Sequence, residues 1–416
     1  MAGAIFVVAG SGTPEQGPVA ALLSTAGWAA AAERVLGRSW VVTPGEVFTP
    51  DEARRRGSDP GLSSPTGPSI RRRLPAVVKT AAKDLLHWRL SRRFAIDPDG
   101  PWAGADLDLV WQRHDLFHTA GLDLARRLMV PSVLFVPAAK VWEAERWGTT
   151  RPGWGGWLER RAERPALVGA DLVACGSETV VEQVLRIGVP AERVLLTPSG
   201  VDLELFADPP DPASLRRRLG LEDRFVIGWT GSFRRFHALE QAVEAAAAVA
   251  GSALLLVGDG PERGRIARLA NELAVPAVFT GTVPHHELPA YLAAMDAAVL
   301  LAPQREPFHY SPLKLAEYLA AGLPVVAPAA GQVAQRLSDG GDALMVPPQD
   351  VAALAAALCR LRDDSEERAR LGKAARAAAE AEWSWDNQIR RVVDTIVSSV
   401  PPRRGRASHT ADHGTS

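Results

Sequence analysis

The chain has 416 residues, of which 47% are hydrophobic and 23% are charged, and its formal net charge is -1. This length exceeds what one hydrophobic core usually supports, so two domains with a cleft between them are expected. The near-neutral charge does not favour nucleic-acid binding, and no apolar run reaches the length of a membrane span. The two cysteines lie far apart without metal-ligand spacing and the N-terminus lacks a signal-peptide pattern, so a cytoplasmic enzyme is expected.

Short apolar runs alternate with helical patterns along the chain, which is typical of βαβ units around parallel sheets. Six strands are predicted in each half, at residues 5–9, 40–43, 109–112, 133–136, 172–174 and 194–197, and at 226–229, 254–257, 278–280, 298–301, 325–327 and 344–346. The expected fold class is α/β, with two Rossmann-like domains of parallel sheet.

A proline-rich segment at residues 207–213 can continue neither a strand nor a helix, so we place a linker there. Residues 51–75 lack periodicity and are expected to form an irregular loop before a helix near 76–94. The expected divisions are an N-terminal domain at 1–205, a linker at 206–222, a C-terminal domain at 223–382, a final helix at 383–400 and a disordered tail at 401–416.

The most informative stretch runs from Tyr310 to Pro328. Ser311 is a good N-cap and Pro312 suits a first helical turn, so a helix over 312–321 is predicted. Its N-terminal amides would be free to hold a diphosphate without a metal. Lys314 and Glu317 share one face, where the lysine suits phosphate and the glutamate suits ribose hydroxyls. The alternative is an ordinary surface ion pair.

Three further turns follow predicted strands in this half. In residues 230–237, Gly231 permits close backbone approach and Arg234 could clamp a diphosphate, although solvated arginines occur in many such turns. Residues 255–262 form a tight turn containing Gly258, which alone indicates only an α/β fold. Residues 280–288 could face a nucleobase, whereas the histidines at 285 and 286 lack metal-ligand spacing and favour a solvated loop.

In this order, the four elements resemble the C-terminal donor-binding domain of the family 4 retaining glycosyltransferases of the GT-B fold. The resemblance covers residues 194–400. It includes the segment from Pro198 to Asp202. It also includes Trp383-Ser384-Trp385, which opens what looks like the family's final helix, the one that crosses back onto the N-terminal domain. It implies a GT-B fold, a nucleotide-sugar-binding C-terminal domain, and retaining transfer to an acceptor hydroxyl without a bound metal.

The resemblance also implies roles for individual residues. Glu317 matches the family's second glutamate, which holds the donor ribose, but the position of the first is occupied by His309, and the nearest upstream carboxylate is Glu306. The arginine and lysine usual in the family's glycine turn fall at Ser232 and His237. The chain looks closer to a branch of the family whose motifs are Gly-Ser-Phe-Arg and Ser-Pro-Leu-Lys. Similarity to that branch implies that Arg234 and Lys314 balance the charge of the phosphates.

The implied site is therefore extensive. The expected catalytic residues are Arg234, Lys314 and His114; those at the diphosphate and sugar are Gly12, Gly231, Ser232, His237, His309, Ser311, Pro312 and Leu313; and those at the nucleoside are Gly258, Val283 and Glu317. No metal ligand is expected. A UDP-sugar donor is favoured, with a GDP-sugar as the alternative.

The N-terminal half offers fewer signals. The loop containing Gly12 fails as a dinucleotide fingerprint, and either faces the donor and acceptor or forms an ordinary turn. Arg113 and His114 follow a strand, where His114 could touch the sugar or acceptor, or the strand end could simply face water. Many relatives place a histidine where this chain has Pro137.

Residues 70–94 combine basic and apolar side chains. This pattern suits either a helix on an anionic membrane surface or, as we favour, a helix with one buried and one solvated face.

The acceptor stays open among saccharides, natural products and lipid-linked molecules, and no nucleic-acid partner is expected. Alternatives to a transferase are a GT-B phosphorylase or epimerase, and a non-catalytic GT-B subunit that binds nucleotide or a partner protein. The departures at His309 and Pro137 keep the last of these alternatives open.

Overall fold

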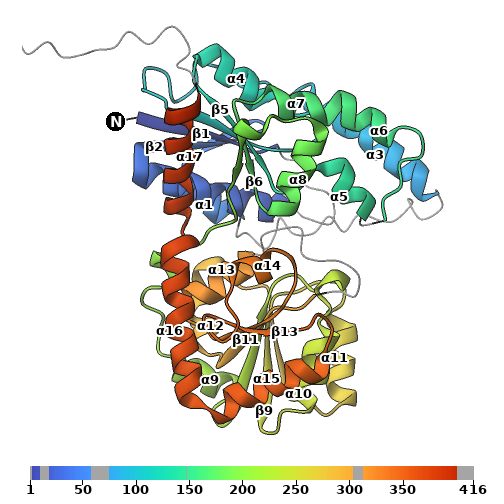
Figure 1. Cartoon of the computed structure of the whole chain (residues 1–416), viewed down its shortest axis with the longest axis vertical. Helices are drawn as coiled ribbons and strands as arrows, with labels where there is room; N and C mark the ends of the chain where they lie inside the picture. The colour runs from blue at the N-terminus through green and yellow to red at the C-terminus, as the bar shows by residue number, and fades with distance from the viewer. Residues whose placement is uncertain (1, 10–17, 58–74, 147, 303–312, 401–416) are drawn as a thin grey trace, which may run out of the picture.

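The computed structural model describes residues 2–9, 18–57, 75–146, 148–302 and 313–400. Two α/β domains lie one above the other, and each is built around a single sheet (Figure 1). This is the GT-B arrangement that the sequence predicted. The expected tail at 401–416 lies outside the described residues.

The N-terminal sheet has seven strands in the order β3-β2-β1-β4-β5-β6-β7, and every neighbouring pair is parallel except β2 and β3. Its strands are β1 (Ala2–Val7), β2 (Gly37–Thr43), β3 (Glu46–Phe48), β4 (Leu109–Arg113), β5 (Ser132–Val136), β6 (Leu172–Cys175) and β7 (Val194–Leu196). The six predicted strands are all present because buried parallel strands read as apolar runs. The sequence analysis missed β3, a three-residue edge strand that lacks such a run.

The N-terminal helices are α1 (Pro18–Leu36), α2 (Pro50–Gly57), α3 (Ala76–Ser91), α4 (Ala120–Leu128), α5 (Lys140–Arg146), α6 (Gly155–Leu158), α7 (Arg164–Gly169) and α8 (Glu178–Ile187). The irregular loop expected from residue 51 is wrong over α2. That helix has acidic residues in its first turn and three arginines in its last, which suits the helix dipole. Thr49 donates its backbone N–H to Glu52, 2.8 Å away, as in a capping box.

The C-terminal sheet is entirely parallel, in the order β10-β9-β8-β11-β12-β13. Its strands are β8 (Phe225–Thr230), β9 (Ser252–Val257), β10 (Ala277–Gly281), β11 (Ala297–Val299), β12 (Val325–Pro328) and β13 (Leu344–Val346). The helices of this domain are α9 (Pro212–Leu219), α10 (Glu240–Ala247), α11 (Arg263–Glu272), α12 (Leu288–Ala293), α13 (Leu313–Ala320), α14 (Gly331–Arg336), α15 (Val351–Asp363) and α16 (Ser365–Glu382), and the chain then continues into α17 (Trp385–Ser399). Apolar side chains on both faces of the sheet form two buried clusters.

The chain passes between the domains twice. Within the expected linker, α9 packs on α12 of the C-terminal domain, and its Leu215 joins the core of that domain. The return passage runs from α16 into α17, which lies against α1 (Figure 1). Trp385 opens α17 and packs on Trp28 with 4.7 Å between the ring centroids. Ile389 and Val392 of α17 join the same buried cluster of the N-terminal domain. The last helix is thus an integral part of the N-terminal core.

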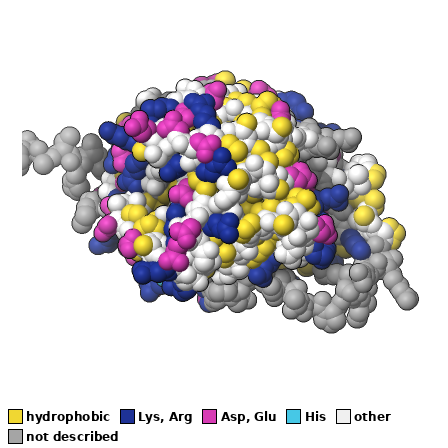
Figure 2. All heavy atoms as spheres, turned by 90° about the horizontal axis from the view of Figure 1, so that it is seen from below, with side chains coloured by type: hydrophobic (Ala, Val, Ile, Leu, Met, Phe, Trp, Pro, Cys, Tyr) yellow, Lys and Arg dark blue, Asp and Glu magenta, His cyan; other side chains and the backbone are white. Residues whose placement is uncertain are grey.

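The surface carries charges of both signs. Figure 2, which views the molecule from the end formed by the C-terminal domain, shows Lys and Arg side chains interspersed with Asp and Glu. This distribution agrees with the net charge of -1. Among the described residues, no helix is both long enough and apolar enough to cross a bilayer.

Candidate functional site

The C-terminal sheet reverses its strand order between β8 and β11, which lie side by side. In open parallel sheets, ligands bind outside the carboxyl ends of the strands at such a point. The turn at residues 231–237 follows β8, and α13 begins on the chain that leaves β11. Both α13 and the neighbouring α14 lie on the side of this domain that faces the N-terminal domain (Figure 1).

Lys314, in the first turn of α13, points back into the turn after β8. Its Nζ lies 3.9 Å from the centroid of the Trp229 ring. Although buried, this amine has no hydrogen-bond partner among the described residues. Burial lowers the pKa of Lys314 to about 7, and Glu317 offsets only part of this shift. A buried ammonium without an acceptor is costly, so an anionic ligand here would regain much interaction energy.

Arg234 and His237 flank the same space. The Arg234 Nε is buried and has no hydrogen-bond partner among the residues described. Burial, together with the charges of Lys314 and Arg234, lowers the pKa of His237 to about 2. The imidazole is therefore neutral, and the positive charge at this end of β8 belongs to the arginine and the lysine. Ser232 is exposed and its carbonyl accepts the Arg234 N–H at 2.8 Å.

Glu317 lies one turn further along α13. Its Oε1 is 3.0 Å from His285 Nε2, so the glutamate is held by the loop after β10 and does not form the alternative ion pair with Lys314. The loop is solvated as expected at the exposed His286, whereas His285 is half-buried and holds Glu317. Val283 of the same loop is half-buried and packs against the domain core.

Two glycines bring the turns at the strand ends into close contact. Gly258 has a φ of +127°, and a Cβ at this position would lie 2.0 Å from the Gly231 carbonyl oxygen. Gly231 has a φ of +137°, and a Cβ there would lie 2.9 Å from Lys314 Nζ. Both positions therefore require glycine, and Gly231 leaves the space that the lysine amine occupies.

Sequence reasoning missed two aromatic residues that support this arrangement. Trp229, at the end of β8, is buried beneath Lys314. Tyr318 is also buried, and its hydroxyl accepts the Thr230 backbone N–H at 2.7 Å, which ties α13 to β8. The available signal for Trp229 was its position directly before the glycine turn. Tyr318 has the sequence pattern of an ordinary core residue.

Several expected site residues lie outside the described residues: Gly12, Glu306, His309, Ser311 and Pro312. Leu313 begins α13 and packs against the apolar cluster of the N-terminal domain. In α14, the Gln332 Nε2–H donates to the Gly176 carbonyl oxygen of the N-terminal domain at 3.0 Å. These contacts place the start of α13 at the boundary between the domains.

His114 is not positioned to meet a substrate. Its Nε2 lies 2.9 Å from Glu163 Oε1, and both side chains are fully buried. The Glu163 carboxylate also accepts the backbone N–H groups of Lys140 and Val141 at the start of α5. The structure supports neither contact with a sugar nor a strand end facing water, because the pair joins β4 to α5 inside the domain.

The helix α3 differs from the expected helix with a buried apolar face. Its buried residues are Asp84 and Ser91, whereas Leu85, Leu86 and Trp88 are exposed. Asp84 is held by Arg151, whose Nε donates to it at 2.9 Å. Polar contacts therefore fix α3, and its apolar side chains stay at the surface.

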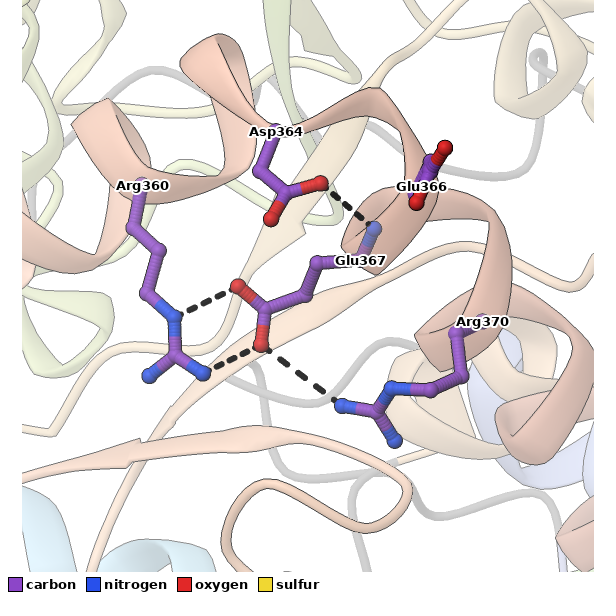
Figure 3. Close-up of a pocket in the computed structure, with 5 residues that line it drawn as sticks. All are labelled: Arg360, Asp364, Glu366, Glu367 and Arg370. Atoms are coloured by element: carbon purple, nitrogen blue, oxygen red, sulfur yellow. Dashed lines mark hydrogen bonds and ion pairs between the residues drawn. The ribbon is translucent and has the colours of Figure 1, made fainter.

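A hollow at the junction of α15 and α16 lies on the side of the C-terminal domain away from the N-terminal domain (Figure 1). Figure 3 shows it lined by Arg360, Asp364, Glu366, Glu367 and Arg370. Glu367 accepts hydrogen bonds from Arg360 and lies 3.6 Å from Arg370. Its carboxylate thus already serves both arginines, so the hollow is a weaker candidate than the switch point of the sheet.

Comparison with known proteins agrees with this geometry in both domains. Residues 29–205 match the family model described as Glycosyltransferase Family 4, and residues 224–364 match that of the Glycosyl transferases group 1.

The curated relatives are also glycosyltransferases. A GDP-mannose-dependent alpha-(1-6)-phosphatidylinositol monomannoside mannosyltransferase of Mycolicibacterium smegmatis is 29% identical over 58% of this chain and 67% of its own. A 2-deoxystreptamine N-acetyl-D-glucosaminyltransferase of Streptomyces fradiae is 31% identical over 50% of this chain and 51% of its own. The chain spans about half to two thirds of the length of the curated relatives it matches.

Solved structures share the fold over nearly the whole chain. HepE of Anabaena in complex with UDP has a TM-score of 0.63 and 17% identity, covering 96% of this chain and 100% of its own. Sucrose-phosphate synthase of Thermosynechococcus elongatus has a TM-score of 0.65 and 21% identity, covering 96% of this chain and 99% of its own. The fold is thus GT-B. Within it, the N-terminal domain is similar to the Glycosyltransferase Family 4 model and the C-terminal domain to the Glycosyl transferases group 1 model.

Proposed function

We propose that the protein transfers a sugar from a nucleotide-diphosphate donor, bound at the carboxyl edge of the C-terminal sheet, to an acceptor hydroxyl. The observation that carries this proposal is the buried amine of Lys314, which lies over Trp229 beside the Gly231 turn with no hydrogen-bond partner among the residues described. Arg234 adds a second cation with an unused buried donor. Two such cations beside the end of β8 match the negative charge of a diphosphate.

The chemistry follows from where charge develops. As the bond between sugar and diphosphate breaks, negative charge grows on the leaving phosphate oxygens, and Lys314 and Arg234 stabilise it. Their charges and the α13 amides allow this step without a bound metal in the donor site. The acceptor hydroxyl attacks from the same face, so the configuration at the sugar is retained, and a phosphate oxygen takes the hydroxyl proton.

Glu317 is assigned to the ribose of the donor. Its Oε1 is fixed by His285 at 3.0 Å, which leaves the second carboxylate oxygen to accept from ribose hydroxyls. The loop after β10, with Val283, is assigned to the base. Both UDP and GDP donors fit this proposal, since a relative of known structure binds UDP and other relatives are named as GDP-mannose-dependent.

The acceptor is proposed as a saccharide, a natural product or a lipid-linked molecule. The printed names of the relatives include a phosphatidylinositol monomannoside and 2-deoxystreptamine as molecules acted on. The exposed apolar side chains of α3, Leu85, Leu86 and Trp88, are compatible with an acceptor at a membrane surface.

Calorimetric titration with UDP, GDP, ADP and dTDP, without added metal, tests the donor site. We expect one nucleotide to bind and the Glu317→Ala variant to weaken it strongly. Binding of none would refute the donor site.

A second candidate function is a non-catalytic GT-B subunit, favoured by His309 in place of the family's first glutamate and by Pro137 in place of a histidine. Such a subunit would bind nucleotide but transfer no sugar from the matching donor to any acceptor in a cell extract.

A further inference from the structure

Three potential metal ligands meet in the N-terminal domain, far from the donor site in sequence. They are His87 of α3 together with Asp115 and His118 of the loop between β4 and α4, and their ligand atoms all lie within 4.8 Å of one another. His87 Nε2 is 3.5 Å from Asp115 Oδ2. His118 is buried and the other two are half-buried.

The position of this cluster in the sheet is the second observation. The N-terminal sheet reverses its strand order between β1 and β4, which are hydrogen-bonded neighbours. Asp115 and His118 follow directly after β4, at the carboxyl edge where α/β proteins place their ligand sites. The cluster therefore occupies, in this domain, the place that Lys314 and the Gly231 turn occupy in the other.

The loop holds its ligands by backbone contacts. Asp115 Oδ1 accepts the Leu116 N–H at 2.9 Å, and the other carboxylate oxygen, Oδ2, is the one near His87. The His118 carbonyl oxygen accepts from the buried Gln112 side chain at 2.6 Å. Phe117, between them, has a φ of +66°, which is unfavourable for a bulky residue. Such strain persists where the surroundings fix the loop, and it is most frequent at functional sites.

We propose that His87, Asp115 and His118 bind a divalent transition-metal ion of the Zn²⁺ type. Two imidazoles and one carboxylate are the ligand set of open zinc sites, in which a fourth position is left for water or another oxygen ligand.

The geometry requires little movement. Zinc bonds of ~2.0–2.2 Å place tetrahedral ligands about 3.3 Å apart, close to the 3.5 Å between His87 and Asp115. The ligand atoms of all three residues lie within 4.8 Å of one another, so small side-chain rotations would bring them to this spacing. The Arg113 guanidinium interacts electrostatically with Asp115. This competing cation is expected to make the site weaker than an isolated one.

Metal binding to the chelator-treated, untagged full chain tests the proposal. The probe is Co²⁺, whose visible absorption bands report tetrahedral nitrogen and oxygen ligands, with Zn²⁺ as competitor. We expect one equivalent to bind, and His87→Gln and Asp115→Asn to weaken it by more than about tenfold. His286→Gln, at an exposed histidine, and a double variant, His409→Gln with His413→Gln, serve as controls and should bind as the unmodified chain does.

Absence of one-equivalent binding in the unmodified chain would overturn the proposal. Binding that survives both ligand variants, or that disappears in either control, would also overturn it. If a ligand variant fails to fold, the melting temperature supplies the second measurement. Zn²⁺ should raise the melting temperature of the unmodified chain and of both controls. Nucleotide binding to the His87→Gln variant is measured in parallel, because the donor site should be unaffected.

Discussion

The lowered pKa of Lys314 predicts that the affinity for the donor falls as the pH rises through neutrality. Its pKa in the unliganded protein is about 7, so half of the molecules carry a neutral amine at that pH. A bound diphosphate favours the ammonium form and should return the pKa toward ~10.4, the ordinary lysine value. Binding is then coupled to proton uptake, and it becomes weaker at a pH where the free amine has lost its proton.

The magnitude follows from the two pKa values. Between the free and bound pKa, the dissociation constant rises about tenfold for each pH unit, or ~1.4 kcal/mol. From about pH 6 to about pH 8 the expected loss of affinity is therefore roughly tenfold, since the change begins only near pH 7.

The assay is isothermal titration with an intact nucleotide sugar, whose two phosphates are both esterified and do not titrate in this range. At pH 7, titrations in buffers of different ionisation enthalpy should report the uptake of about half a proton per donor bound. Lys314→Arg is the matched variant because arginine keeps its charge at every pH used. It should bind with little dependence on pH, while Lys314→Met should bind weakly throughout.

Two results would refute this reasoning. A flat pH profile in the unmodified protein would mean that the amine is already protonated when free. The same slope in Lys314→Arg as in the unmodified protein would assign the proton to another group.

The remaining predictions concern the same edge of the sheet. Arg234→Ala should lower turnover by about 10²–10³, as the loss of one preorganised donor does, measured as steady-state transfer once the donor is known. His285→Ala should weaken nucleoside diphosphate binding about tenfold, since Glu317 loses the partner that orients it, which calorimetry measures. Gly258→Ala should lower both the melting temperature and the donor affinity, because its Cβ would lie 2.0 Å from the Gly231 carbonyl oxygen.

Each of these predictions has a matched control. Turnover of Arg235→Ala, at the exposed neighbouring arginine, should stay near that of the unmodified protein. A similar loss there would contradict the role proposed for Arg234. The effect of His285→Ala should vanish for a nucleotide without ribose hydroxyls; an equal loss would mean that the histidine does not act through the ribose. Gly251→Ala, where a Cβ meets no atom within 4 Å, should destabilise less than Gly258→Ala, and the opposite order would contradict the packing argument.

The sequence by itself determined the GT-B fold and the order of its elements. Buried parallel strands are apolar along their whole length, and glycine, proline and capping residues mark where they end. All twelve predicted strands are present for this reason. The short antiparallel strand β3 and the helix α2 were missed because one is a three-residue edge strand and the other carries a run of arginines without apolar periodicity.

The residues predicted for the donor site lie on turns and at a helix start, where the sequence patterns had put them. Gly231, Arg234, Lys314 and Glu317 lie at strand ends or at a helix start, positions that local patterns mark. The sequence could not place them relative to one another, since their distances depend on how neighbouring strands pair.

Only the tertiary structure decided which polar side chains meet. His285 was expected in solvent and instead holds Glu317, and His114 was expected near substrate and instead pairs with Glu163 inside the core. His87 reaches the loop after β4 only because α3 packs there. These contacts join residues tens of positions apart, and hydrophobic periodicity carries no information about such pairings. Their energies come from burial and from the proximity of polar and charged groups, which exist only once the domain that holds each contact has folded.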